Sequence, residues 1–95
     1  MGYYINPRNE TKEEFLKKNG KSITNILSFR FNDVEPGYLP VVLLDNGHFT
    51  AAGICYDERE FLDFIDPNDS RPKTLFVVSI EKLLEVEPNL KHVLK

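Results

Sequence analysis

The feature that most constrains this chain is the continuous apolar run LPVVLL at residues 39–44. Such a run is typical of a strand that is buried on both faces of a sheet. Asn46 and Gly47 follow it, and this dipeptide is the strongest short-range signal for a β-hairpin. It predicts a type I′ turn, with positive φ at both residues, and a return strand at about 48–55. An antiparallel hairpin is therefore the predicted centre of the fold.

The return strand has a middle with almost no side-chain bulk, the tripeptide Ala51-Ala52-Gly53. Small side chains let a helix or another backbone lie close to a sheet, and this is the explanation we favour. The alternative is that a partner or a ligand approaches the sheet at this point.

The N-terminal part of the chain predicts one helix and one strand. Thr11 and Glu14 have the spacing of a capping box at the start of a helix. This helix is expected to run to about Asn19, with Gly20 as a left-handed C-cap. Residues 27–31 alternate between apolar and polar, which is the period of a half-buried strand.

The C-terminal part predicts a second helix, another strand and a short third helix. Asp57 is the expected N-cap of the second helix, which ends before Pro67. An apolar stripe at helical spacing follows Asp57 and consists of Phe61, Leu62, Phe64 and Ile65. Residues 75–78 are a strongly apolar strand, and a short helix is expected at 80–86.

Together these elements predict an α+β fold: a single small domain spanning residues 1–95, with a mainly antiparallel sheet of three to four strands packed by two to three short helices. The length of 95 residues fits one domain and not two. Two points of topology stay open. Residues 3–7 form either a short edge strand or an extended arm, and strand 75–78 lies either antiparallel or parallel to its neighbour. An exposed edge strand also leaves a homodimer open.

The sequence favours a cytoplasmic protein that does not associate with a membrane. A single cysteine excludes an internal disulfide and a zinc site built from several cysteines. The N-terminus lacks the apolar segment of a signal peptide. No apolar run approaches the roughly 20 residues that a membrane-spanning helix needs.

Tests for catalytic, cofactor-binding and metal-binding patterns give none. The two histidines, His48 and His92, lack the spacing of metal ligands, and the acidic segment 63–69 lacks the glycine and glutamate of a calcium loop. Cys55 and His48 are seven residues apart on one predicted strand, so they face opposite sides. The glycine patterns of phosphate-binding loops are missing. We therefore predict no catalytic residue, no cofactor and no metal, with a small enzyme whose site is assembled across the fold as an alternative.

The charge of the chain is unevenly distributed. Residues 1–30 carry six basic and three acidic side chains, whereas residues 31–95 carry six basic and twelve acidic ones. The overall acidity argues against general nucleic-acid binding. The nucleic-acid alternative would use a basic N-terminal helix with two aromatic stacking groups. Its residues would be Lys12, Lys17, Lys18 and Lys21, together with Tyr3 and Tyr4.

Two charged surface features are candidates for contact with a protein partner. The acidic segment 57–69 is either a solvated helix face or a mimic of nucleic-acid phosphates. In the mixed-charge loop 66–73, Asp69 and Arg71 pair either with each other or with a partner, and Pro72 limits the freedom of the loop. The candidate partner-binding residues are Asp57, Glu58, Arg59, Asp63, Asp69, Arg71 and Lys73.

Three stretches of the sequence carry a resemblance to a known family. They are MGYYINP at the start, LLDNGHFTAAGICYDEREFLDF at 43–64, and DSRPK at 69–73, which precedes an apolar strand. The chain resembles a small family of uncharacterised proteins that is associated with plasmids, phages and other mobile elements of bacteria. That family has no established activity, so the resemblance transfers no residue role. It implies an accessory protein that acts on host machinery or on maintenance of the element.

The leading hypothesis is a non-enzymatic protein-binding module whose partner is a host protein or protein complex. Its most specific form is an inhibitor of a host defence complex, such as a restriction or CRISPR effector. Small size, the acidic segment and the resemblance motivate this hypothesis.

Overall fold

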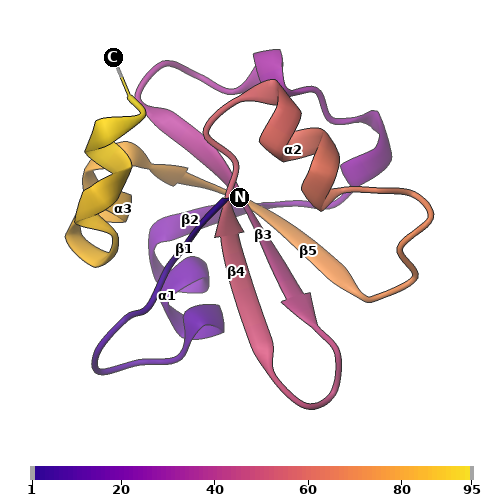
Figure 1. Cartoon of the computed structure of the whole chain (residues 1–95), viewed down its shortest axis with the longest axis horizontal. Helices are drawn as coiled ribbons and strands as arrows, with labels where there is room; N and C mark the ends of the chain where they lie inside the picture. Colours follow the sequence, from indigo (N-terminus) through magenta and orange to yellow (C-terminus); the bar gives the residue numbers. More distant parts are fainter. Residues whose placement is uncertain (1, 95) are drawn as a thin grey trace.

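A five-stranded antiparallel sheet with the strand order β1-β4-β3-β5-β2 organises the fold (Figure 1). The computed structural model describes residues 2–94, so the first and last residues of the predicted domain lie outside the description. The strands are β1 (Tyr3–Tyr4), β2 (Gly20–Ile23), β3 (Tyr38–Asp45), β4 (Thr50–Ile54) and β5 (Lys73–Ser79). The helices are α1 (Lys12–Asn19), α2 (Glu58–Phe64) and α3 (Ile80–Val86). The predicted α+β class is confirmed, with five strands in place of the predicted three to four.

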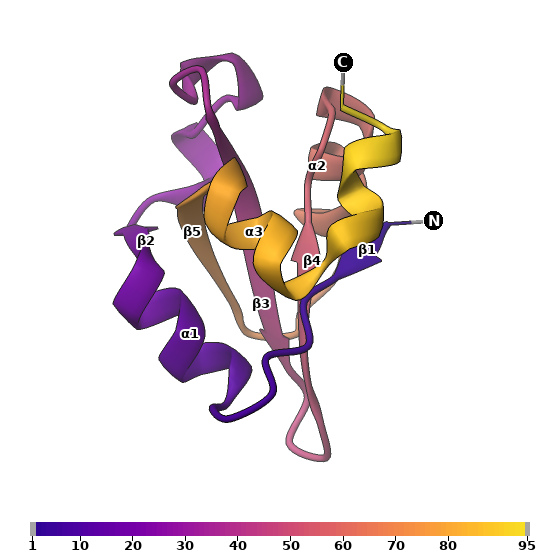
Figure 2. The same cartoon turned by 90° about the vertical axis from the view of Figure 1, so that its left-hand side faces the viewer.

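The helices lie on both faces of the sheet. Figure 2 shows the strands side by side, with α3 in front of them, and in Figure 1 α1 and α3 lie on one side of the strands and α2 on the other. Side chains alternate along a strand, so neighbouring residues of β3 point to opposite faces. Val41 faces the layer of α1 and α3, and Val42 faces the layer of α2.

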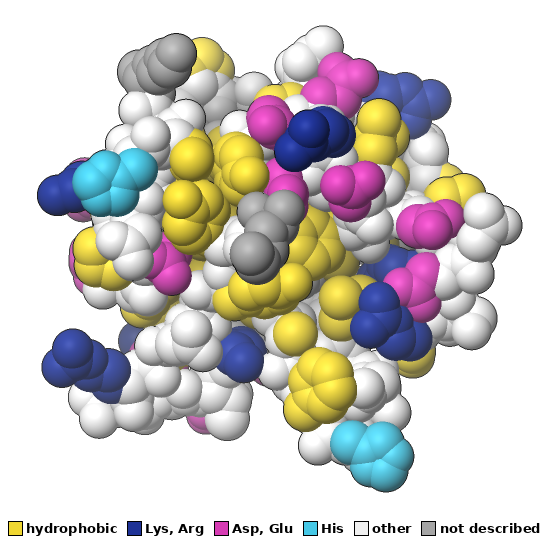
Figure 3. Space-filling view, in the orientation of Figure 1, with side chains coloured by type: hydrophobic (Ala, Val, Ile, Leu, Met, Phe, Trp, Pro, Cys, Tyr) yellow, Lys and Arg dark blue, Asp and Glu magenta, His cyan; other side chains and the backbone are white. Residues whose placement is uncertain are grey.

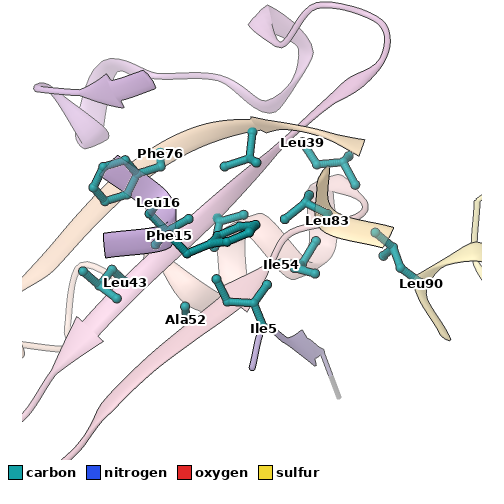
Figure 4. Close-up of a cluster of buried hydrophobic side chains, with 12 residues drawn as sticks. Ile5, Phe15, Leu16, Leu39, Leu43, Ala52, Ile54, Phe76, Leu83 and Leu90 are labelled. Carbon is teal, nitrogen blue, oxygen red and sulfur yellow. The ribbon is translucent and has the colours of Figure 1, made fainter. Parts of the chain in front are cut away.

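Each face therefore has its own apolar core. The core under α1 and α3 contains twelve buried residues (Figure 4), among them Phe15 and Leu16 from α1 and Leu83 from α3. The core under α2 is smaller and consists of Val42, Leu44, Cys55, Phe61 and Leu75. The strands β3 and β5 contribute to both cores, which couples the two layers.

The central hairpin forms as predicted, but its turn differs. Residues 46–49 connect β3 to β4, and of the two predicted positive-φ residues only Gly47 has one, at 89°. The Asn46 side chain explains the difference, because its Oδ1 accepts hydrogen bonds from the amides of His48 (2.9 Å) and Phe49 (3.0 Å). This arrangement closes a longer loop and shortens the predicted return strand.

The segment after α1 departs most from prediction. The helix α1 and its capping box at Thr11 are confirmed. Gly20, however, is extended, with φ −125° and ψ 169°, and it begins the edge strand β2. A Cβ atom at residue 20 would crowd the Leu16 carbonyl and the Val78 side chain, so close packing explains this glycine.

The predicted strand at 27–31 is wrong. The chain forms two single-turn 3-10 helices there, Ile26–Ser28 and Phe31–Asp33. The Arg30 amide donates to the Asp33 carboxylate at 3.0 Å, a local bond that competes with strand pairing. The alternating apolar residues of this segment still pack against a helix, because Phe29 and Phe31 both contact Phe61 of α2.

The two open points of topology are decided by the strand pairing. Tyr3–Tyr4 is an edge strand that pairs with β4. The strand β5 is antiparallel to both of its neighbours, so the parallel alternative does not occur. The predicted helix at 80–86 matches α3, and a 3-10 helix at Pro88–His92 follows it.

Candidate protein-interaction surface

The outer face of α2 presents four of the seven candidate residues. Asp57 caps the helix, with its Oδ1 accepting from the Glu60 amide at 2.8 Å, as predicted. The candidate side chains on this helix are exposed to solvent: Asp57, Glu58, Arg59 and Asp63. Three of these four are acidic, so α2 carries a negative outer face.

Leu62 was predicted to lie in the buried stripe of α2, and this is wrong because 56% of it is exposed. Phe61, Phe64 and Ile65 have the i, i+3, i+4 spacing that faces the sheet. Leu62 is one position further round the helix from Phe61, so it points away from the core. An exposed leucine between Glu58 and Asp63 is a feature that the sequence pattern did not reveal.

A groove of about 500 Å³ runs along one side of α2. Its floor is apolar and comes from α2 and from the 3-10 segment before β3. The lining residues include Phe29, Phe31, Phe61, Leu62 and Ile65, with Arg30, Asp33 and Glu58 at the rim. The groove exists because the segment at 26–33 folds back over α2 instead of joining the sheet.

A second hollow of about 380 Å³ lies on the other side of α2, next to the central hairpin. Its lining residues are Tyr4, Leu44, Phe49, Ala51, Asp63, Phe64 and Arg71. Figure 3 shows hydrophobic atoms gathered between α2 and this hairpin, with charged atoms around them. The structure therefore brings Asp63 and Arg71 together at an aromatic hollow.

The loop between α2 and β5 is held by its own charged residues. The Arg71 guanidinium donates to both oxygens of the Asp69 carboxylate, with Nε–Oδ1 at 3.0 Å and Nη2–Oδ2 at 2.5 Å. These bonds, and one from the Arg71 amide, hold the pKa of Asp69 well below its ordinary value. Lys73 Nζ donates to the Asp69 carbonyl at 2.7 Å. Of the two interpretations of this loop, the internal ion pair is the one observed.

The seven candidates thus form two groups with different surroundings. Those on α2 point into solvent beside two hollows, whereas Asp69, Arg71 and Lys73 stabilise the adjoining loop. Arg71 belongs to both settings, because it also lines the hollow next to Asp63.

The residues of the nucleic-acid alternative are dispersed. Lys17 pairs with Glu13 at 2.8 Å and Lys18 with Glu10 at 2.9 Å. Lys12 Nζ donates to the Thr50 carbonyl at 3.0 Å. Tyr3 contacts Tyr56, while Tyr4 contacts Phe64 under α2, on the face opposite α1. Adjacent strand residues point to opposite faces, so the two tyrosines do not form one stacking surface.

The groups considered for catalysis are also apart. Cys55 is fully buried in the core under α2. Burial, followed by the carboxylates of Glu60 and Asp57, raises the pKa of its thiol well above the ordinary value. His48 lies in the exposed hairpin loop at the far end of β4. In the described range 2–94, no three His, Cys, Asp or Glu residues are grouped so that they could hold a metal ion.

None of the helices between residues 2 and 94 is long and apolar enough to cross a membrane. Comparison of the chain with protein-family models, curated proteins and solved structures gives no match.

Proposed function

We propose that this chain is a non-enzymatic protein-binding module that contacts its partner through the outer face of α2. The exposed Leu62 carries the proposal, because a leucine with 56% exposure lines the apolar groove beside α2 and neighbours acidic side chains. An apolar centre with a polar rim is the usual anatomy of a protein interface.

The charge of this face indicates the chemistry of the partner. Asp57, Glu58 and Asp63 outnumber Arg59, and residues 31–95 as a whole are acidic. Such a face attracts a partner with a basic surface and repels an acidic one. The resemblance to mobile-element proteins supports a host protein or protein complex as the partner, with a restriction or CRISPR effector as the most specific proposal.

The test is affinity capture from a bacterial lysate with the tagged full chain, in parallel with two variants. Leu62→Asp removes the apolar centre, and Asp63→Lys reverses a charge next to it. Glu81→Lys is the matched control, since it makes the same change in charge at an exposed position of α3.

We expect one protein to be captured in proportion to the bait by the wild type and by Glu81→Lys. Both α2 variants should recover about tenfold less of it, because interface centres contribute most of the binding free energy. Leu62 and Asp63 are exposed, so circular dichroism should show both variants folded. Equal recovery by all four baits would contradict the proposed function.

A further inference from the structure

The hollow beside the central hairpin resembles a nearby position on the same strand that an aromatic ring already fills. On the α2 face of β4 the side chains are small, Ala51 and Gly53. The Phe64 ring lies over Gly53 so closely that a Cβ atom at residue 53 would overlap it. Two residues further along the strand, Ala51 is only partly covered and lines the hollow of about 380 Å³.

The open position over Ala51 resembles the filled position over Gly53. Phe64 is held edge-on against Tyr4, with ring centroids 6.0 Å apart and planes at 83°. One strand repeat, about 6.7 Å, separates the two positions along β4. The hollow has Tyr4 and Phe64 at one end and the exposed Phe49 at the other. Its walls therefore suit a second aromatic ring.

The rim of the hollow carries one carboxylate, that of Asp63, and one guanidinium, that of Arg71. The guanidinium of Arg71 is held by the Asp69 carboxylate within the loop. Asp63 also lines the hollow, and among residues 2–94 its carboxylate forms no ion pair or hydrogen bond. A cationic group beside the bound ring would complement Asp63.

The wall on the hairpin side is already ordered. The Phe49 amide donates to Asn46 Oδ1 at 3.0 Å, and the Asn46 amide donates to the Phe49 carbonyl at 3.3 Å. Gly47 is tied to Asp45 Oδ1 at 2.9 Å. A loop fixed in this way loses little conformational entropy when a ligand arrives.

We propose that the hollow over Ala51 is the specificity pocket of the interaction surface, and that it takes an aromatic side chain flanked by Lys or Arg from a partner protein. This proposal rests on the proposed function and names the chemistry that the α2 surface recognises.

The test is an NMR titration of the ¹⁵N-labelled full chain with three acetylated, amidated tripeptides: Lys-Phe-Lys, Lys-Ala-Lys and Glu-Phe-Glu. Lys-Phe-Lys should give saturable shifts of the amides of Tyr4, Ala51 and Asp63. The other two should bind at least threefold more weakly, since one lacks the ring and the other opposes Asp63. Equal titration by all three peptides, or no saturable shift with Lys-Phe-Lys, would overturn the proposal.

Two variants locate the binding. Ala51→Leu fills the hollow and should abolish the Lys-Phe-Lys shifts, and Phe49→Ser removes one wall at an exposed position and should weaken binding at least threefold. Undiminished shifts in a folded variant would place the peptide elsewhere and overturn the proposal. Asp63→Asn should cost about two- to fivefold in affinity, the size of an exposed ion pair.

Lysate capture separates the two proposals. If the Ala51→Leu variant still captures the partner protein but the Leu62→Asp variant does not, the α2 face binds the partner and the pocket does not set specificity. If both variants keep the partner, the proposed function itself is wrong. Loss in both variants, together with the peptide result, supports both.

Discussion

At the scale of single residues, Gly53 shows how one position shapes the surface. A glycine in a strand weakens the strand unless another group needs the space. Here the ring of Phe64 occupies that space. The preference for a structural explanation of the tripeptide Ala51-Ala52-Gly53 is therefore confirmed at Gly53, where a helix side chain lies against the sheet.

Gly53→Ala should lower the free energy of unfolding by about 1–3 kcal/mol, the usual cost of overpacking. The loss should shrink in a Phe64→Leu background, because the ring that collides with the new methyl group is gone. Urea unfolding of the four proteins of this double-mutant cycle measures the coupling. An unchanged cost in the Phe64→Leu background would mean that backbone freedom, and not the ring, selects glycine.

Asp69 is the residue with the clearest dependence on pH. The Arg71 guanidinium lowers the pKa of Asp69, so the folded chain binds this proton less readily than the unfolded chain does. The stabilisation is therefore fully present above the unfolded pKa of about 3.9 and is lost as the pH falls below it. Relative to Asp69→Asn, the wild type should lose stability between about pH 4 and pH 2.

An NMR titration of the Asp69 carboxyl carbon provides the direct measurement. In Arg71→Ala the pKa should return toward about 3.9. Lys82→Ala, which removes the exposed pair with Glu85 on α3, is the control and should leave Asp69 unchanged.

At the scale of elements, the N-cap of α1 sets where this short helix begins. Only Phe15 and Leu16 of α1 are buried, and the helix has eight residues. Thr11 Oγ1 accepts from the Glu14 amide at 3.1 Å, and Glu14 Oε1 accepts from the Thr11 amide at 2.9 Å. Both bonds are local, which is why a four-residue pattern predicted the start of this helix correctly.

Thr11→Ala should lower the free energy of unfolding by about 1 kcal/mol, the typical cost of losing an N-cap hydroxyl. Thr11→Ser keeps the hydroxyl and should stay close to the wild type. Thermal unfolding of the three proteins distinguishes the loss of the cap from a general effect of substitution at this site. Equal stability of the alanine and serine variants would show that the cap contributes nothing.

At the scale of the whole molecule, the shared sheet should make the two cores unfold together. Cys55 lies in the core under α2, and Leu83 lies in the core under α3. The strands β3 and β5 contribute side chains to both cores. A thiol reagent reaches the buried Cys55 only when the core around it opens, so labelling of this thiol reports on one core from within.

Leu83→Ala should lower the free energy of unfolding by about 2–5 kcal/mol through the cavity it leaves. If the cores are coupled, the opening free energy from Cys55 labelling should fall by the same amount, although the two residues lie on opposite faces. Unchanged labelling would show instead that the α2 layer opens on its own. Glu81→Ala, an exposed substitution on the same helix, is the control.

The sequence by itself determined the elements whose signals are local. The apolar run of β3, the Thr11 and Asp57 caps and the helix at Ile80–Val86 each depend on residues a few positions apart. Each of these signals lies within one segment of the chain, so a short sequence pattern is sufficient to predict the element.

The tertiary structure alone decided the features that need distant partners. The strand β2 exists because Gly20–Ile23 pairs with β5, more than fifty residues away. Residues 26–33 leave the sheet because Phe29 and Phe31 pack on α2. The candidate site follows the same division: the acidic residues of α2 were predicted from sequence, but the hollow that joins Asp63 to Tyr4 and Ala51 was not. Its walls come from β1, the central hairpin, α2 and the loop after α2, and only the packing of these parts of the chain brings them together.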